Sequence, residues 1–140
     1  MIRTARPPDL PVLRAIQATA LREPWPDLLA TAATGRGGPL ALVAIDARGV
    51  PVGYALAVPG ESTAYLAELA VAPGRRGEGR GSALLSAVTD RLADAGCETV
   101  WLTARADDRR TLSFYRERGF TVRERLPGHY ADGDGVELVR

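Results

Sequence analysis

The sequence has little that would support a disulfide, a metal centre or a membrane span. Its 140 residues include one cysteine, Cys97, and one histidine, His129. No intrachain disulfide and no cysteine-based zinc cluster can therefore form, and we expect no metal. The longest stretch without a charged residue, residues 49–60, is too short to cross a bilayer. The first residues lack the apolar core of a signal peptide, so we expect a cytoplasmic protein with Cys97 as a small buried hydrophobe.

The net charge of the chain is close to zero and so indicates no particular class of partner. The formal net charge is +1, and all 18 basic residues are arginine, with no lysine and no asparagine. We interpret this as coding bias, which weakens arginine runs as evidence for phosphate binding. Nucleic acid and membranes are not expected as partners. The length, with 25% charged and 46% hydrophobic residues, is typical of one globular domain over residues 1–140, as a monomer or homodimer.

What the sequence does contain is a glycine-rich loop at residues 71–82, which reads Val-Ala-Pro-Gly-Arg-Arg-Gly-Glu-Gly-Arg-Gly-Ser. Gly77, Gly79 and Gly81 stand at every second position, after an apolar strand-like run and before an amphipathic stretch. Glycine allows a tight turn and close approach of the backbone to a ligand. A helix that opens there presents unpaired N–H groups and its positive dipole end. The loop therefore predicts an anion site, most often for a phosphate or pyrophosphate.

Two well-known phosphate loops do not fit this segment. The nucleotide-binding P-loop, G-x-x-x-x-G-K-S/T, would begin at Gly74, but Arg80 and Gly81 stand where lysine and a hydroxyl residue are needed. The dinucleotide fingerprint G-x-G-x-x-G would begin at Gly77, but Ser82 stands in place of its last glycine. A surface turn without a ligand remains the alternative reading.

The pattern that fits is R/Q-x-x-G-x-G, formed by Arg76, Gly79 and Gly81. It resembles the acetyl-CoA pyrophosphate loop of the GCN5-related N-acetyltransferase (GNAT) superfamily. Residues 101–120, with Tyr115 four positions before the Gly-Phe pair, are similar to the later strand-and-helix signature of that superfamily. The ending at residues 129–136 and the pair at 24–25 look most like the ribosomal-protein alanine N-acetyltransferases. The resemblance runs from about residue 8 to the end.

The hydrophobic periodicity predicts alternating elements. Strands are expected at residues 2–6, 40–45, 51–58, 63–71, 99–104, 120–126 and 136–140. Helices are expected at residues 8–20, 27–33 and 82–95, and from a cap at Asp107 or Asp108 to Arg118. This order predicts an α+β fold in α/β/α layers. The resemblance implies the GNAT fold, with a mixed, mostly antiparallel sheet of six to seven strands and about four helices.

The resemblance also implies a reaction, the transfer of an acetyl group from acetyl-CoA to a primary amine in a ternary complex. The amine would belong to a peptide N-terminus or a small molecule. The strands at 63–71 and 99–104 would splay apart to admit the cofactor. Its implied binding residues are Leu69, Ala70, Val71, Arg76, Gly77, Glu78, Gly79, Arg80, Gly81, Ser82, Asp108 and Tyr115.

Proton transfer needs an acid and a base. Tyr115 matches the general acid of the family, although a core aromatic residue at that position is the alternative. The look-alike enzymes carry a glutamate at the position of Thr103, and threonine is no base at neutral pH. Glu68 is the carboxylate on the preceding strand, on the same face as Ala70, and burial there would favour a base. A solvent-facing rim carboxylate is the other reading of Glu68. Asp108 replaces the asparagine of the family as a helix cap.

Three residues are candidates for the acceptor side: Trp25, His129 and Tyr130. A core position for Trp25 and a solvated loop position for His129 are the alternatives. At the level of the whole protein, the loss of the glutamate at Thr103 also favours a second hypothesis, a catalytically silent CoA-binding module or sensor. A third is an interaction protein whose glycine-arginine loop binds another anion.

Overall fold

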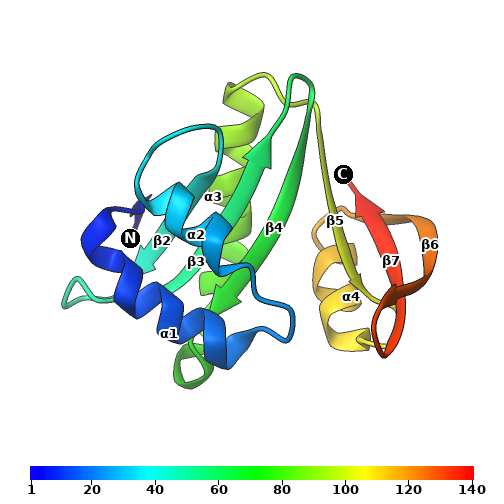
Figure 1. The fold of residues 1–140 in the computed structure, drawn as a ribbon, viewed down its shortest axis with the longest axis horizontal. Coiled ribbons are helices and arrows are strands. Elements are labelled where there is room, and N and C mark those ends of the chain that lie inside the picture. Colours follow the sequence, from blue (N-terminus) through cyan, green and yellow to red (C-terminus); the bar gives the residue numbers. More distant parts are fainter.

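One seven-stranded sheet runs through the computed structural model, which describes all 140 residues (Figure 1). The strands lie in the order β1-β2-β3-β4-β5-β7-β6. Neighbours are antiparallel except β4 and β5, which are parallel. Their bounds are β1 Ile2–Thr4, β2 Leu40–Ile45, β3 Pro51–Pro59, β4 Thr63–Val71, β5 Thr99–Arg105, β6 Thr121–Tyr130 and β7 Gly133–Val139.

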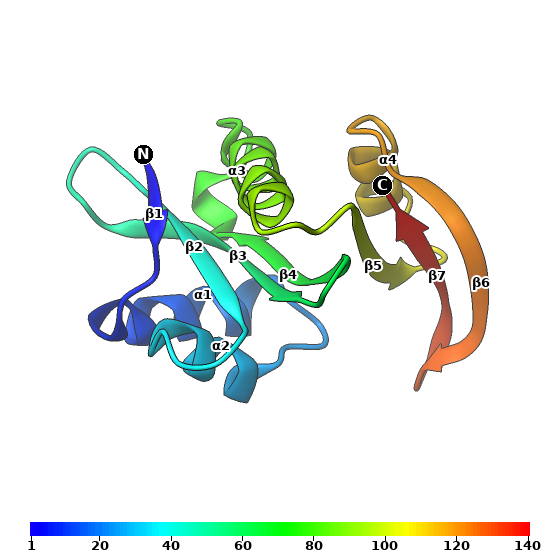
Figure 2. The ribbon, with the colours of Figure 1, turned by 90° about the horizontal axis from the view of Figure 1, so that it is seen from above.

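Helices cover both faces of the sheet. Figure 2 shows α1 and α2 on one face and α3 and α4 on the other. Their bounds are α1 Leu10–Ala20, α2 Pro26–Ala33, α3 Arg80–Asp94 and α4 Arg109–Arg116, with 3-10 turns at Pro7–Asp9 and Pro73–Arg75. The predicted α+β fold in α/β/α layers is confirmed, with a mixed, mostly antiparallel sheet. No helix is long and apolar enough to cross a membrane.

Strand alternation divides the apolar side chains into two cores. On β2, Leu42 and Ala44 pack with α3 and α4, whereas Ala41 and Val43 pack with α1 and α2. The α3 side holds the larger cluster, and Cys97 is buried in it as expected. A strand that is apolar on both faces must be covered on both, which explains why β2 and β3 lie in the interior of the sheet.

The sheet opens between its two parallel strands. β4 and β5 pair only at Thr63↔Thr99, Ala64↔Val100 and Tyr65↔Trp101. Beyond these pairs the two strands diverge toward their carboxyl ends, as Figure 1 shows. The predicted splay is therefore present, and it leaves the backbone of β4 from residue 66 to 71 without a partner on the β5 side.

A β-bulge decides which way the carboxylate of β4 points. Leu56 of β3 lies opposite Glu68 and Ala57 lies opposite Leu66, so Ala67 is the extra residue. In a regular strand Leu66 and Glu68 would share a face. Here Leu66 packs in the core on the α3 side, whereas Glu68 contacts α1 and β3 on the other side. The bulge thus turns Glu68 away from α3.

Several predicted boundaries need correction. The first strand ends at Thr4, because Asp9 accepts the backbone N–H of Arg6 (2.7 Å) and a 3-10 turn precedes α1. The region from 127 to 135 was expected to be a loop, but β6 and β7 continue through it to a tight turn after Tyr130. A register shift between Leu126 and Tyr130 interrupts the β6–β7 pairing. The alternation of apolar and polar residues that marks a strand is therefore weak in this part of the sequence.

Candidate active site

The glycine-rich loop leads directly into α3, a helix of 15 residues whose N-cap is Gly79. Gly77 and Gly79 have φ angles of 81° and 79°, in the left-handed region that side-chain-bearing residues rarely adopt. Gly81 is different, because a Cβ there would meet only the Phe114 ring at 3.6 Å and Val71 at 3.8 Å. The backbone conformation therefore favours glycine at 77 and 79. The first N–H groups of α3 have no partner within the helix, and no side chain caps them.

The arginines of the loop are held mainly by local partners. Arg75 bonds Asp46 (3.1 Å) and Glu78 (3.3 Å), and Arg80 also bonds Glu78. Arg76 donates from Nε to the carbonyl oxygen of Val71 (3.3 Å), so no carboxylate neutralises its charge. Among the loop arginines, Arg76 is thus the cation most available to an anion.

A further cation reaches the start of α3 from the other half of the sheet. Arg118 donates from Nε to the Ser82 hydroxyl (3.1 Å), and its guanidinium lies 3.9 Å from the centre of the Phe114 ring. The position of Arg118 in the sequence gives no sign of this contact, because nothing in its spacing shows that the end of α4 packs beside the start of α3.

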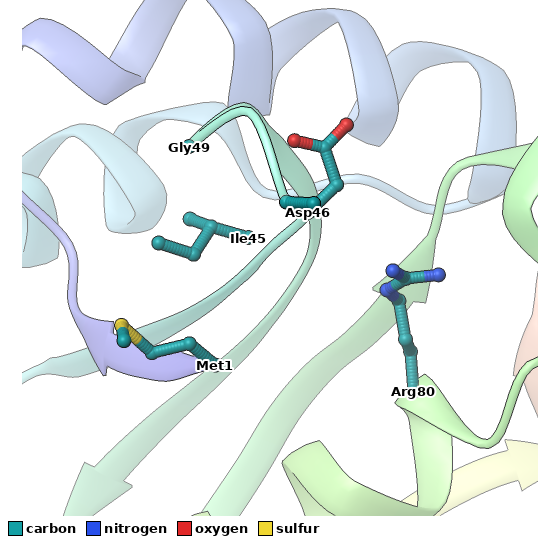
Figure 3. Close-up of a pocket in the computed structure, with 6 residues that line it drawn as sticks. Met1, Ile45, Asp46, Gly49 and Arg80 are labelled. Atoms are coloured by element: carbon teal, nitrogen blue, oxygen red, sulfur yellow. The ribbon is translucent and has the colours of Figure 1, made fainter.

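A shallow pocket of about 430 Å³ lies at the edge of the loop. Figure 3 shows Met1 and Ile45 on one side of it and Arg80 on the other. The remaining lining residues are Asp46, Ala47 and Gly49 of the β2–β3 turn. None of these residues belongs to β4 or β5, so the pocket is separate from the splay. No group of three or more histidine, cysteine, aspartate or glutamate side chains is placed to hold a metal ion.

Asp108 and Tyr115 both belong to α4. The sequence left the helix cap open between Asp107 and Asp108. The cap is Asp108, which accepts the backbone N–H of Thr111 (3.1 Å) and its hydroxyl (2.7 Å). Tyr115 is buried between Phe114 and Phe120, with ring centroids 5.2 and 5.4 Å away. Burial raises the pKa of the Tyr115 phenol. The residue is therefore a neutral O–H donor, and it packs in the core at the same time.

Glu68 lies at the centre of a buried hydrogen-bond network and is only 5% exposed. Its Oε1 accepts from Gln17 Nε2 (2.8 Å) and from the Tyr54 hydroxyl (2.8 Å), and its Oε2 accepts from the backbone N–H of Trp25 (2.7 Å). Three donors compensate the carboxylate for the water it has lost. The reading of Glu68 as a solvent-facing rim carboxylate is therefore wrong.

The same network fixes the connection between α1 and α2. The indole of Trp25 is half exposed, so the core alternative for this residue is wrong. Burial and the adjacent Glu68 raise the pKa of Tyr54, which keeps its hydroxyl protonated as a donor. Gln17 and Tyr54 gave no signal in the sequence, because their partner is 51 residues away for Gln17 and 14 for Tyr54.

Beside Glu68, β5 presents a second row of side chains to the α1–α2 face. Trp101 stacks on Tyr65 at a centroid distance of 4.4 Å, and Thr103 follows on the same face. Burial raises the pKa of Tyr65, against an opposing contribution from a hydrogen bond with Thr103. This row has no carboxylate, as the sequence implied.

At the end of β5, Arg105 joins two segments that are distant in the sequence. It pairs with Glu23 of the α1–α2 connection and with Asp132 of the β6–β7 turn (2.8 Å). Asp132 also pairs with Arg22 (3.1 Å), and the Arg105 interaction lowers the pKa of Asp132. Strand alternation after Thr103 predicts that Arg105 lies on this face. Its partners, Glu23 and Asp132, are distant in the sequence and are brought to it only by the fold.

The two candidates on β6 lie next to this ion network. Tyr130 has the Arg105 guanidinium 4.6 Å from its ring centre. His129 packs edge-on against Tyr130, with 4.8 Å between centroids. His129 is exposed, but it lies on a strand and not in the expected loop.

Comparison with known proteins agrees with this geometry. The family model described as "Acetyltransferase (GNAT) family" matches residues 10–120. The chain belongs to this family. The matched residues include the glycine loop, α3 and both strands of the splay.

Individual relatives cover nearly the whole chain. The ribosomal protein bS18-alanine N-acetyltransferase of Escherichia coli is 29% identical over 129 residues, which are 92% of this chain and 86% of the relative. The crystal structure of the E. coli ribosomal-protein-S18-alanine N-acetyltransferase has a TM-score of 0.85 and 27% identity, and covers 99% and 91% of the two chains. Ard1 of Thermoplasma volcanium has a TM-score of 0.87 at 26% identity, over 100% and 95%.

The Glu68 network predicts a measurable cost when one donor is removed. Tyr54→Phe keeps the ring but deletes a hydrogen bond to a buried charge, which is worth about 1.5–3 kcal/mol. We expect the free energy of unfolding, measured by urea denaturation, to fall by that amount. Tyr130→Phe is the control, because the Tyr130 hydroxyl has no recorded partner. Equal stability of Tyr54→Phe and the native chain would contradict the network.

Proposed function

We propose that this chain is an acetyl-CoA-dependent N-acetyltransferase that transfers an acetyl group directly to a primary amine. One observation carries the proposal: β4 and β5 stop pairing after three residue pairs, and the unpaired part of β4 carries Glu68 and ends at the glycine loop before α3. A thioester and an amine that approach from opposite faces would meet there. Holding two reactants together in this way can account for several kcal/mol of rate acceleration, roughly 7–11 at best.

The residues present fit the cofactor. The left-handed glycines at 77 and 79 expose backbone N–H groups at the start of α3, and Arg76 supplies a cation without a carboxylate partner. When bound, acetyl-CoA would supply an activated acetyl thioester. The residues proposed to hold it are Leu69, Ala70, Val71, Arg76, Gly77, Glu78, Gly79, Arg80, Gly81, Ser82, Asp108 and Tyr115. Asp108 would act through the cap of α4.

For the acceptor we propose the N-terminal amine of a peptide or protein, or a small-molecule amine, in the cytoplasm. An N-terminal alanine is the first to test, because the E. coli relatives are named for an alanine of protein bS18. Trp25, half exposed above Glu68, and the Tyr130–His129 pair on β6 would border this side.

The proton roles are assigned to two buried groups. Glu68 would accept the proton of the ammonium through an intervening water, because its own oxygens are covered by three donors. Tyr115, a neutral phenol, would donate a proton to the leaving sulfur.

A second candidate function is a CoA-binding module without turnover. The full hydrogen bonding of Glu68 and the threonine at 103 favour it, because neither leaves an unengaged carboxylate in the site. An assay of acetyl-CoA consumption in the presence of amines distinguishes the two functions.

Cofactor binding gives the first functional prediction. Acetyl-CoA should raise the melting temperature, as any ligand of the native state does. In Gly79→Val this rise should disappear, because a side chain enters the loop and disfavours a φ of 79°. Gly35→Val is the matched control, since Gly35 has a φ of 71° and open space but lies in the α2–β2 connection. Undiminished binding by Gly79→Val would place the cofactor elsewhere.

The acid role predicts a specific defect in Tyr115→Phe. The ring and its contacts with Phe114 and Phe120 remain, and only the hydroxyl is lost. General acid catalysis contributes on the order of 100- to 10,000-fold, so kcat should fall by a factor in this range. The dissociation constant for CoA should change little. If kcat is unchanged while chemistry limits the rate, Tyr115 only packs.

The base role predicts a change in the pH profile of Glu68→Gln. The acid limb of kcat/KM reports the ionisation of the base in the free enzyme. We expect kcat/KM at neutral pH to drop by about 100- to 10,000-fold and the inflection of that limb to vanish. Tyr54→Phe is the control, because it disturbs the network but keeps the carboxylate. The same inflection in Glu68→Gln would show that another group is the base.

A further inference from the structure

Few polar side-chain contacts hold the two sides of the splay together. One side consists of β1–β4 with α1–α3, and the other of β5–β7 with α4. On the α3 face the link is Arg118 to Ser82. On the α1–α2 face the links are Tyr65 to Thr103 between the strands and two ion pairs, Arg22 to Asp132 and Arg105 to Glu23. Both ion pairs involve the α1–α2 connection, whose Trp25 N–H binds Glu68.

The ion pairs of Arg105 and Arg22 on this face differ in strength. Arg105 is only 11% exposed, contacts both carboxylates and lies on the Tyr130 ring. Its Nε is buried without a hydrogen-bond partner, so its position is imposed by the surrounding contacts. In the outer pair, by contrast, the side chains of Arg22 and Asp132 are 66% and 58% exposed. Exposed pairs of this kind are weak and are screened by salt.

The α1–α2 connection is therefore attached at two points. The backbone N–H of Trp25 binds Glu68 on β4, and Glu23 binds Arg105 on β5. The Arg22–Asp132 pair then extends from the same connection to the β6–β7 turn. An amine that reaches Glu68 from this face has the connection on one side and the turn on the other. The exposed Arg22–Asp132 pair joins the two at the surface, and the nearly buried Arg105 joins them at the sheet through Glu23 and Asp132.

We propose that Arg22 and Asp132 form an acceptor latch that determines how far an acceptor extends beyond its reacting amine. The inference rests on the proposed function. An acceptor of one residue fits behind the latch, whereas a longer peptide must leave between the α1–α2 connection and the β6–β7 turn and so breaks the Arg22–Asp132 pair. Arg105 and Glu23 keep the connection in place when the outer pair opens.

The test uses binding, so that it does not depend on turnover. Two probes carry CoA joined through an acetyl bridge to an α-amine, either of alaninamide or of the uncharged hexapeptide amide Ala-Gly-Ser-Gly-Ser-Gly. Their dissociation constants are measured by calorimetry beside that of CoA alone. Arg22→Ala should tighten binding of the hexapeptide probe by about 1.5- to 5-fold, the worth of an exposed pair. Binding of CoA and of the alaninamide probe should not change.

Two comparisons make the result specific. Arg22→Lys keeps the charge and should retain most of the discrimination between the probes. Arg125→Ala removes an exposed pair with Asp134 in the same hairpin, which does not touch the α1–α2 connection, and should behave as the native chain. Added salt should favour the hexapeptide probe in the native chain but not in Arg22→Ala.

The possible failures are distinct. If CoA binds but Arg22→Ala changes the ratio of the two probe affinities no more than Arg125→Ala does, the latch is disproved and the proposed function stands. If CoA itself does not bind, the proposed function fails, and the latch fails with it.

Discussion

The structure depends on the point at which two parallel strands stop pairing. β4 and β5 share three residue pairs and then separate. Unpaired backbone in a sheet is costly unless another group uses it. The separation is maintained because each strand has its own second neighbour, β3 for β4 and β7 for β5. It is bridged on one face by the contact of α4 with the start of α3 and on the other by the Arg105 network.

The buried Glu68 is the second constraint, and it follows from the bulge at Ala67. A buried carboxylate without partners would be strongly unfavourable, so its surroundings must supply donors. They come from three elements, with Gln17 on α1, Tyr54 on β3 and the backbone of Trp25. The carboxylate thereby holds the α1–α2 connection against β4. The proposed catalytic role would fall to the same group.

The two faces of the sheet thus have separate tasks. The α3 face provides the glycine loop, the start of α3 and the Arg118 contact, all suited to an anion. The α1–α2 face provides Glu68, the Tyr65–Trp101 stack and the ion network around Arg105. Tyr115 belongs to the α4 side of the core and is buried there by its aromatic neighbours. This division is what the proposed direct transfer, between ligands on opposite faces of the sheet, would require.

The sequence by itself determined the order of the elements, the glycine loop, an aspartate cap at 107 or 108 and the family. These features are local: they rest on periodicity, on left-handed glycines and on a side chain that bonds three residues onward. It also placed Glu68 and Thr103 on the two parallel strands that separate, β4 and β5. Only the tertiary structure decided that Glu68 is saturated by donors, that Trp25 is half exposed and that β6 and β7 extend to Tyr130. Tertiary structure alone also joined Arg22, Glu23, Arg105 and Asp132. The physical reason is that the partners of a buried charge or an ion pair are set by which elements the sheet brings together. Pairs separated by 82 or 110 positions leave no periodic trace in the chain.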